Sequence, residues 1–111
     1  MIKIDLEDLV KRKRLQVKHA DYVIILSNTA IIIEETSRPK LDDVEKLNKT
    51  RELIREGLLE PEIPKNLNKT IGVIHRSQGI DAPVTKTARW RGYAIVNCDK
   101  SLSEFLQKLK E

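Results

Sequence analysis

The chain contains few aromatic residues and a single cysteine: among its 111 residues, Phe and Trp occur once each and Tyr twice. The one cysteine, Cys98, excludes an internal disulfide framework and a zinc site made of several cysteines. No apolar run is longer than five residues, whereas a membrane-spanning helix needs about 20. Residues 1–10 alternate acidic and apolar side chains, a pattern that does not resemble a signal peptide. We therefore expect a cytoplasmic protein without a membrane partner.

Apolar and charged residues are both plentiful, at 40% and 34% of the chain. The apolar fraction suffices for a packed core, and the length suits one domain spanning residues 1–111. With 21 Lys and Arg against 17 Asp and Glu, the net charge of +4 permits an anionic partner without requiring one. The abundance of Ile, Lys and Glu is typical of proteins from thermophiles.

The order of hydrophobic segments predicts an α/β fold, a small mixed sheet with a central β-hairpin flanked by helices. Both hairpin strands are apolar at consecutive positions, which predicts that both of their faces are covered. Residues 76–92 are polar and contain Gly79, Pro83 and Gly92, so we expect a loop there. The predicted elements are a short helix capped by Asp5, strands at 22–26 and 30–33, a helix over 39–57, strands at 71–74 and 93–96, and a last helix opening at Ser101.

The hairpin contains the one group of residues whose types and spacing suggest a chemical site. If Asn28 and Thr29 form its turn, Asp21 lies opposite Thr36 and Glu34 lies opposite the residue two after Asp21. Asp21 and Glu34 then share one face as diagonal neighbours about 7–8 Å apart, while Glu35 faces the other side. Two carboxylates at that spacing can close around one divalent cation. A register shift of one residue would separate them.

The chain has an Asp before one strand, a tight hairpin, an apolar strand ending in Glu, and then a helix and another strand. This order resembles the core of the PD-(D/E)xK nuclease superfamily. Residues 21–37, Asp-Tyr-Val-Ile-Ile-Leu-Ser-Asn-Thr-Ala-Ile-Ile-Ile-Glu-Glu-Thr-Ser, are similar in particular to the archaeal Holliday-junction resolvase branch. The resemblance covers about residues 20–56. It implies a restriction-endonuclease-like fold with helix, strand, strand, helix, strand, strand, helix in order. It also implies Mg²⁺ held by Asp21 and Glu34, metal-assisted phosphodiester hydrolysis and a homodimer.

One position departs from that pattern, because Thr36 stands where the superfamily has a catalytic lysine. A hydroxyl cannot supply positive charge to the transition state. Lys40, Lys46 or Lys49 from the following helix could replace it. Lys46 and Lys49 share a helix surface, so the sequence alone does not separate them. A further acid that often completes the metal site would be Glu7 or Asp8. Without a lysine, the chain would be a degenerate, inactive relative that needs no magnesium.

The excess positive charge lies in two segments, residues 11–18 and 76–91. Guanidinium groups bind phosphate, and an exposed indole can stack on a base. The candidate nucleic-acid contacts are Arg12, Arg14, Arg76, Lys86, Arg89, Trp90 and Arg91.

Each of these features also has a structural interpretation. Asp21 and Glu34 could merely end apolar strands where the chain re-enters water, the basic run 11–18 could be a solvated helix face, and Trp90 could anchor a protein interface. Cys98 follows a strand and is expected to be a buried small residue. Two function classes therefore remain open: a nucleic-acid-binding, nuclease-like protein, and a non-catalytic binding, assembly or accessory module that acts through protein contacts.

Overall fold

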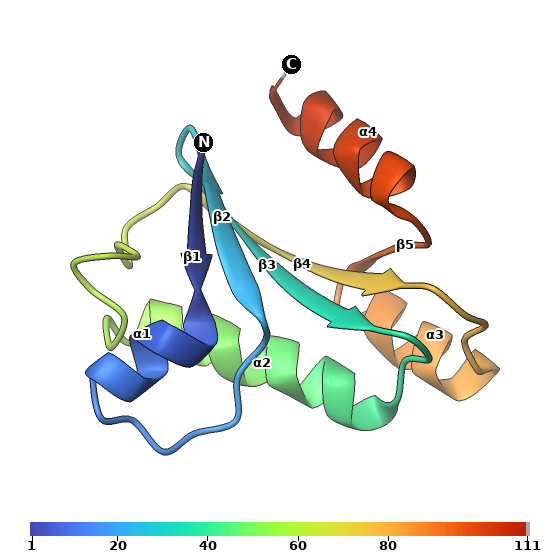
Figure 1. Ribbon diagram of the computed structural model, residues 1–111, viewed down its shortest axis with the longest axis horizontal. Helices are drawn as coiled ribbons and strands as arrows, with labels where there is room; N and C mark the ends of the chain where they lie inside the picture. Colours follow the sequence, from blue (N-terminus) through green and yellow to red (C-terminus); the bar gives the residue numbers. More distant parts are fainter. Residues whose placement is uncertain (111) are drawn as a thin grey trace.

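A five-stranded mixed sheet lies between helices on both of its faces in the computed structural model, which describes residues 1–110 (Figure 1). The strands are β1 (Ile2–Asp5), β2 (Tyr22–Leu26), β3 (Thr29–Thr36), β4 (Lys69–Arg76) and β5 (Ala94–Val96). The helices are α1 (Leu6–Arg12), α2 (Leu41–Arg55), α3 (Ala82–Trp90) and α4 (Asp99–Lys110). The sheet order is β1-β2-β3-β4-β5, antiparallel between β1, β2 and β3 and parallel between β3, β4 and β5. The expected α/β class with a mixed sheet and a hairpin at its centre is confirmed.

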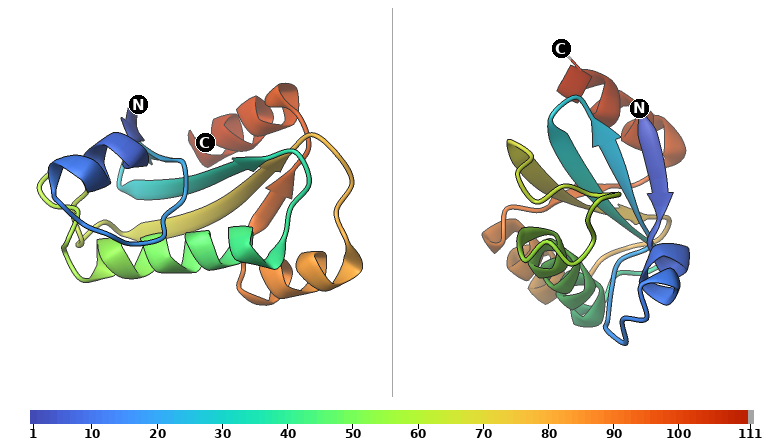
Figure 2. Two further views of the ribbon diagram at one scale, coloured as in Figure 1. Left: turned by 60° about the horizontal axis from the view of Figure 1, so that its bottom comes forward. Right: turned by 90° about the vertical axis from the view of Figure 1, so that its left-hand side faces the viewer.

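Both faces of the hairpin are covered, as its continuous apolar runs predicted. Helices α1, α2 and α3 pack on one face, where Val23 and Ile32 are fully buried, and α4 lies on the other, over Ile31 and Ile33 (Figure 2). Burying one such side chain contributes roughly 1.5–3 kcal/mol. The face beneath α4 is less completely covered, because no residue of α4 itself is buried. Within residues 1–110, each helix is too short or too polar to cross a membrane.

The hairpin register differs from the prediction by two residues. Ser27 and Asn28 form the turn, Leu26 pairs with Thr29, and Tyr22 pairs with Ile33. The turn begins one residue earlier than expected because Ser27 adopts a positive φ of 54°, and short hairpin turns need positive φ. A shift of two keeps every side chain on its predicted face, since side chains alternate with a period of two.

Two elements were missed, and the predicted element order is therefore wrong. Residues 2–5 form a strand rather than part of the first helix, because they complete the sheet edge beside β2. Residues 82–90 form α3 rather than a loop, with Val84 and Ala88 buried one helical turn apart and Pro83 tolerated in the first turn. The expected N-cap is confirmed: the Asp5 carboxylate accepts a hydrogen bond from the Asp8 backbone N–H at 3.1 Å.

Helix α2 carries the residues that matter for the site, and its ends are well defined. Lys40 is the N-cap residue, and its backbone N–H donates to the Asp43 carboxylate at 2.8 Å. Beyond the C-terminus, Gly57 adopts a φ of +76°, a conformation that favours glycine. Val44 and Leu47 face the sheet and are buried, so the intervening Lys46 emerges at the flank of the helix toward β3.

Candidate functional site

Asp21 and Glu34 lie next to each other at one end of the hairpin. The pairing of Tyr22 with Ile33, continued by one residue, sets Asp21 directly opposite Glu34. The Asp21 backbone N–H donates to the Ile33 carbonyl at 3.2 Å, and its carboxylate accepts from the Glu35 backbone N–H at 2.7 Å. Asp21 is thus directly opposite Glu34 rather than its diagonal neighbour, and the Asp21 carboxylate is held by the backbone of the residue after Glu34.

Glu34 is almost entirely buried, with 2% of its surface exposed. Its Oε2 lies 3.3 Å from the Lys46 ammonium, and its Oε1 is buried without a hydrogen-bond partner among the described residues. Lys46 also lies 3.8 Å from the Asp43 carboxylate, and its side chain remains 34% exposed. Glu34, Asp43 and Lys46 therefore form one charged cluster between β3 and α2, with Asp21 beside it.

The surroundings of Glu34 in this cluster disfavour its ionised form. Burial raises the pKa of Glu34 to about 8, and the neighbouring carboxyl groups of Asp43 and Asp21 act in the same direction, while Lys46 opposes them. The Lys46 pKa is raised by the charge of Glu34 and Asp43, against the effect of its own partial burial. At pH 7 Glu34 is mostly protonated and Lys46 is charged.

A hollow of about 490 Å³ opens beside Asp21. It is lined by Lys3, Asp5, Glu7, Asp21, Tyr22 and Glu35. Of the two acids that could complete a metal site, Glu7 lies in this hollow, where its carboxylate is 3.2 Å from His19 Nε2, whereas Asp8 is paired with Arg12 at 2.9 Å. Four carboxylates against one lysine make the hollow acidic, so an anionic phosphate would enter it only together with cations.

The donor set fits a magnesium ion in its chemistry. Magnesium prefers oxygen ligands and is commonly held by one or two carboxylates, with waters completing its octahedron. Asp21 and Glu34 offer such oxygens, and the unpartnered Glu34 Oε1 is a buried acceptor with unused capacity. Across residues 1–110 no three His, Cys, Asp or Glu side chains are grouped closely enough to hold a metal by themselves, so waters or substrate would have to supply the other ligands.

Only one of the three lysines proposed from the sequence is brought to the carboxylates. Lys46 contacts Glu34, while Lys40 is the exposed N-cap residue of α2 and bonds Asp43 through its backbone. Lys49 pairs instead with Glu52 at 3.6 Å. Asp43 was missed, and its sequence signal was its place three residues before Lys46, on the same helix surface.

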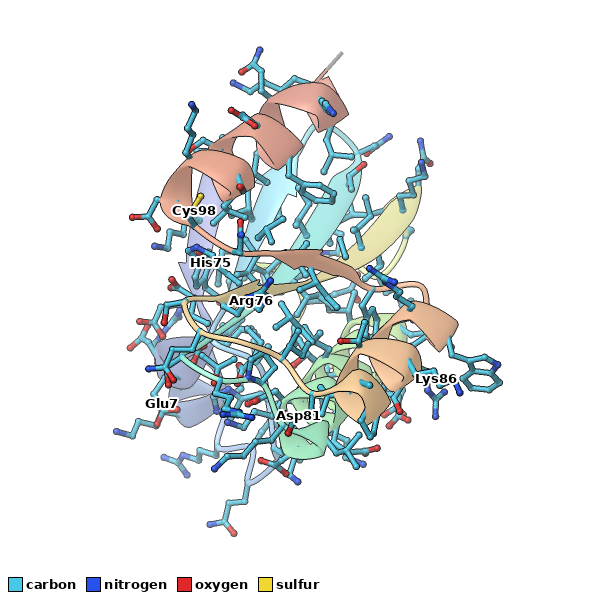
Figure 3. The ribbon with its side chains drawn as sticks, turned by 90° about the vertical axis from the view of Figure 1, so that its right-hand side faces the viewer. Glu7, His75, Arg76, Asp81, Lys86 and Cys98 are labelled. Carbon is cyan, nitrogen blue, oxygen red and sulfur yellow. The ribbon has the colours of Figure 1, made fainter. Side chains whose placement is uncertain are left out.

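The opposite face at this end of the sheet holds a second hollow, of about 550 Å³, at the carboxyl ends of β3, β4 and β5. His75, 91% buried, lies between two carboxylates, 3.2 Å from Glu35 and 3.5 Å from Asp99. Glu35 faces this side, as predicted. Figure 3 shows Arg76 and Cys98 near His75, and Cys98 is exposed rather than buried because it precedes α4 outside the sheet.

The two basic segments have different surroundings. In residues 11–18, Arg12 pairs with Asp8 and Glu62, and Lys18 pairs with Asp42, so much of this charge is neutralised within the chain. Arg14 is exposed with a positive φ of 57°. The basic residues of the second segment, 76–91, do not all lie together. Arg76 donates to the Gln78 carbonyl at 2.6 Å and lines the His75 hollow, away from the basic residues of α3.

The remaining predicted nucleic-acid contacts lie together on α3 and the residue after it. They are Lys86, Arg89, Trp90 and Arg91. Trp90 is 80% exposed.

Comparison of the whole chain with family models, with curated proteins and with solved structures gave no match.

Proposed function

We propose that this protein is a nuclease-like, nucleic-acid-binding enzyme that hydrolyses phosphodiester bonds with the help of Mg²⁺ at Asp21 and Glu34. The observation that carries the proposal is the convergence of Asp21, Glu34 and Lys46 at one end of the hairpin, with Lys46 3.3 Å from Glu34. A lysine beside paired carboxylates is what the resemblance to the PD-(D/E)xK superfamily calls for, and here it comes from α2 instead of position 36.

The arrangement of elements supports the same fold type. Asp21 precedes β2, a two-residue turn leads into β3, and β3 connects through α2 to the parallel strand β4. This is the strand, hairpin, helix and strand succession on which the resemblance rests. The strand β1 ahead of α1, and Thr36 in place of the motif lysine, are this chain's own departures.

Each residue has a definite role in the proposed reaction. Asp21 and Glu34 would supply oxygen ligands to a magnesium ion. When bound, the ion would supply polarisation of a phosphate and a lowered pKa of a coordinated water. Lys46, partly exposed and charged, offsets the negative charge that accumulates on the phosphate in the transition state. Glu7 lies in the hollow beside Asp21 and adds negative potential near that carboxylate.

A second function follows from the same contact. Lys46 already contacts Glu34 within the chain, and a purely structural contact would leave a non-catalytic module that binds nucleic acid or another protein. The two functions differ in one measurable respect, because only the enzyme cleaves a strand when a divalent cation is added.

The test is cleavage of labelled single-stranded, duplex and branched DNA and RNA with Mg²⁺ or Mn²⁺. We expect cleavage that is lost in Glu34→Gln and Asp21→Asn, and that falls at least roughly 100-fold in Lys46→Met, since removing one preorganised transition-state contact costs about 10²–10³ in rate. Lys49→Met is the matched control, one helical turn away and paired with Glu52. Absence of metal-dependent cleavage from every substrate would leave the binding module, and equal loss in Lys49→Met would contradict the assigned role of Lys46.

A further inference from the structure

An exposed aromatic and basic surface lies on the far side of α2 from the carboxylates. We call it the Trp90 surface. Its members are Lys86, Arg89, Trp90, Arg91 and Tyr93, with Arg51 and Arg55 of α2. In Figure 3, Lys86 lies on one side of the molecule and Glu7 of the acidic hollow on the other, so this surface is separate from the candidate catalytic site.

Trp90 is the most exposed aromatic ring of this surface and lies between two hollows, of about 370 and 430 Å³. The Arg91 guanidinium carbon is 5.3 Å from the centre of the indole ring. Tyr93 is buried in the wall of the 370 Å³ hollow, where its hydroxyl donates to Asn48. The Arg51 guanidinium carbon lies 5.8 Å from the centre of the Tyr93 ring. The wall is thus fixed, while the indole presents a flat apolar face to solvent.

The charges around the indole are mainly positive. Lys86 and Arg89 of α3 and Arg91 just after it follow one another without an intervening acid, and Arg51 and Arg55 face them from α2. Glu45 and Glu52 also line the 370 Å³ hollow, and Glu52 is 3.6 Å from Lys49. The potential therefore favours phosphates along α3 and disfavours them against the acids of α2.

A flat indole surrounded by guanidinium groups is suited to a base with a free face. In a duplex both faces of each base are covered by its neighbours, so stacking on a side chain requires a base that is unpaired or displaced. Stacking of successive bases on aromatic side chains, with Arg and Lys along the backbone, is the usual way in which proteins bind single strands.

We propose that the Trp90 surface binds an unpaired nucleotide of a nucleic-acid strand, its base stacked on the indole and its phosphates on Lys86, Arg89 and Arg91. This inference rests on the proposed function, because the strand is taken to be the substrate that reaches the Asp21, Glu34 and Lys46 site. Lys46 and Arg51 lie on different flanks of α2, and a helix is about 10–12 Å wide. A strand in contact with both therefore spans several nucleotides, and the preferred substrate contains a single-stranded segment of that length.

Trp90 is the only tryptophan of the chain, so its fluorescence reports on this surface alone. The full chain in EDTA is titrated with an eight-nucleotide single strand of mixed sequence and with the matching blunt duplex. We expect saturable quenching by the single strand, and an affinity for it at least about fivefold higher than for the duplex. Because EDTA removes divalent cations, binding is measured independently of catalysis, and a failure of the proposed enzyme leaves this result readable.

Variants are compared by the anisotropy of a labelled single strand. Trp90→Ala is expected to weaken binding about 5- to 150-fold, the value of one base stacked on an aromatic ring, while Trp90→Phe keeps most of the affinity. Leu58→Ala, which removes another exposed apolar side chain, is the control and should have no effect. Because Trp90 is exposed, its replacement leaves the fold intact, which circular dichroism verifies.

Three results would overturn the proposal. The first is equal quenching by duplex and single strand, and the second is unchanged affinity in Trp90→Ala. The third is a blue shift of Trp90 emission that grows with protein concentration in the absence of any oligonucleotide, because it would show that a second copy of the chain covers the indole. If cleavage activity is found, Trp90→Ala should raise KM for single-stranded substrates and leave kcat unchanged.

Discussion

Replacing Glu34 with Gln should change how stability depends on pH, and the structure sets both the sign and the size of the change. The folded pKa of Glu34 is about 8 against an ordinary value of 4.5, chiefly because the carboxyl is buried. Below pH 4.5 the carboxyl is protonated in both the folded and the unfolded chain. Between these two pH values only the folded chain keeps the proton, so stability falls as the pH rises.

The magnitude follows from the two pKa values. When the folded chain binds one proton more than the unfolded chain, the free energy of unfolding falls by about 1.4 kcal/mol for each step of one in pH. From pH 4.5 to pH 8 the total is up to roughly 5 kcal/mol, and above pH 8 the loss stops because both states are ionised. Gln resembles the protonated acid in shape, so the Glu34→Gln variant lacks this decline.

The assay is urea denaturation of the wild type and of Glu34→Gln at pH 5, 6, 7, 8 and 9. Subtracting the two free energies of unfolding at each pH removes the contributions of all other groups. We expect similar stability at pH 5 and a variant more stable than the wild type at pH 9 by several kcal/mol. A difference that stays within about 1 kcal/mol over this range, or a wild type that gains on the variant at high pH, would refute the reasoning.

The same measurement tests the magnesium ligands without any activity. At pH 9 the Glu34 carboxylate is ionised, so a cation bound by it and Asp21 should raise the free energy of unfolding of the wild type with its concentration, by about 2.7 kcal/mol at 100 times its Kd. Glu34→Gln should respond much less. An equal response of both proteins would mean that any bound cation is held elsewhere.

Two further predictions concern packing and the free thiol. A Cβ at Gly72 would lie 2.4 Å from Cδ1 of Tyr93, whereas one at Gly79 would meet nothing within 4 Å. Gly72→Ala should therefore lower the free energy of unfolding by about 1–3 kcal/mol or more. Gly79→Ala should change it by less than about 0.5 kcal/mol. Hydrogen bonds from Ser101 lower the pKa of the exposed Cys98 thiol, so Ser101→Ala should move the midpoint of the pH-dependent rate of thiol labelling upward, and an unchanged midpoint would contradict that cause.

The central hairpin could be predicted because its signal is local. Consecutive β-branched residues on both sides of Ser27 and Asn28 favour two strands with both faces buried, and the layers on either side confirm it. The pairing register of the hairpin could not be predicted from this local pattern, because the position of the turn depends on the backbone conformation of Ser27. The face of Glu34 was nevertheless correct, since a two-residue error preserves the alternation.

The missed elements depend on tertiary contacts rather than on local pattern. Residues 2–5 are too few to signal a strand and become one by pairing with β2. Helix α3 contains Pro83 and several polar residues, and only Val84 and Ala88 mark its buried side. Its position against α2 then creates the surface around Trp90, which the sequence suggested by composition but could not locate.

The chemistry of the candidate site was the least predictable part, because it depends on which lysine reaches Glu34. The sequence did not decide among Lys40, Lys46 and Lys49, and the difference arises from α2. Its N-cap leaves Lys40 in solvent, Lys49 pairs with Glu52, and Lys46 emerges one residue before Leu47, which is buried against the sheet. The resulting contact explains why two functions compete for the same residues. The Glu34 carboxyl group is buried, has a raised pKa and contacts Lys46. A cation must therefore displace both the Glu34 proton and the Lys46 contact before it binds. Metal affinity at this site should therefore increase with pH, and the lysine that a cation displaces is the one that would then face the phosphate.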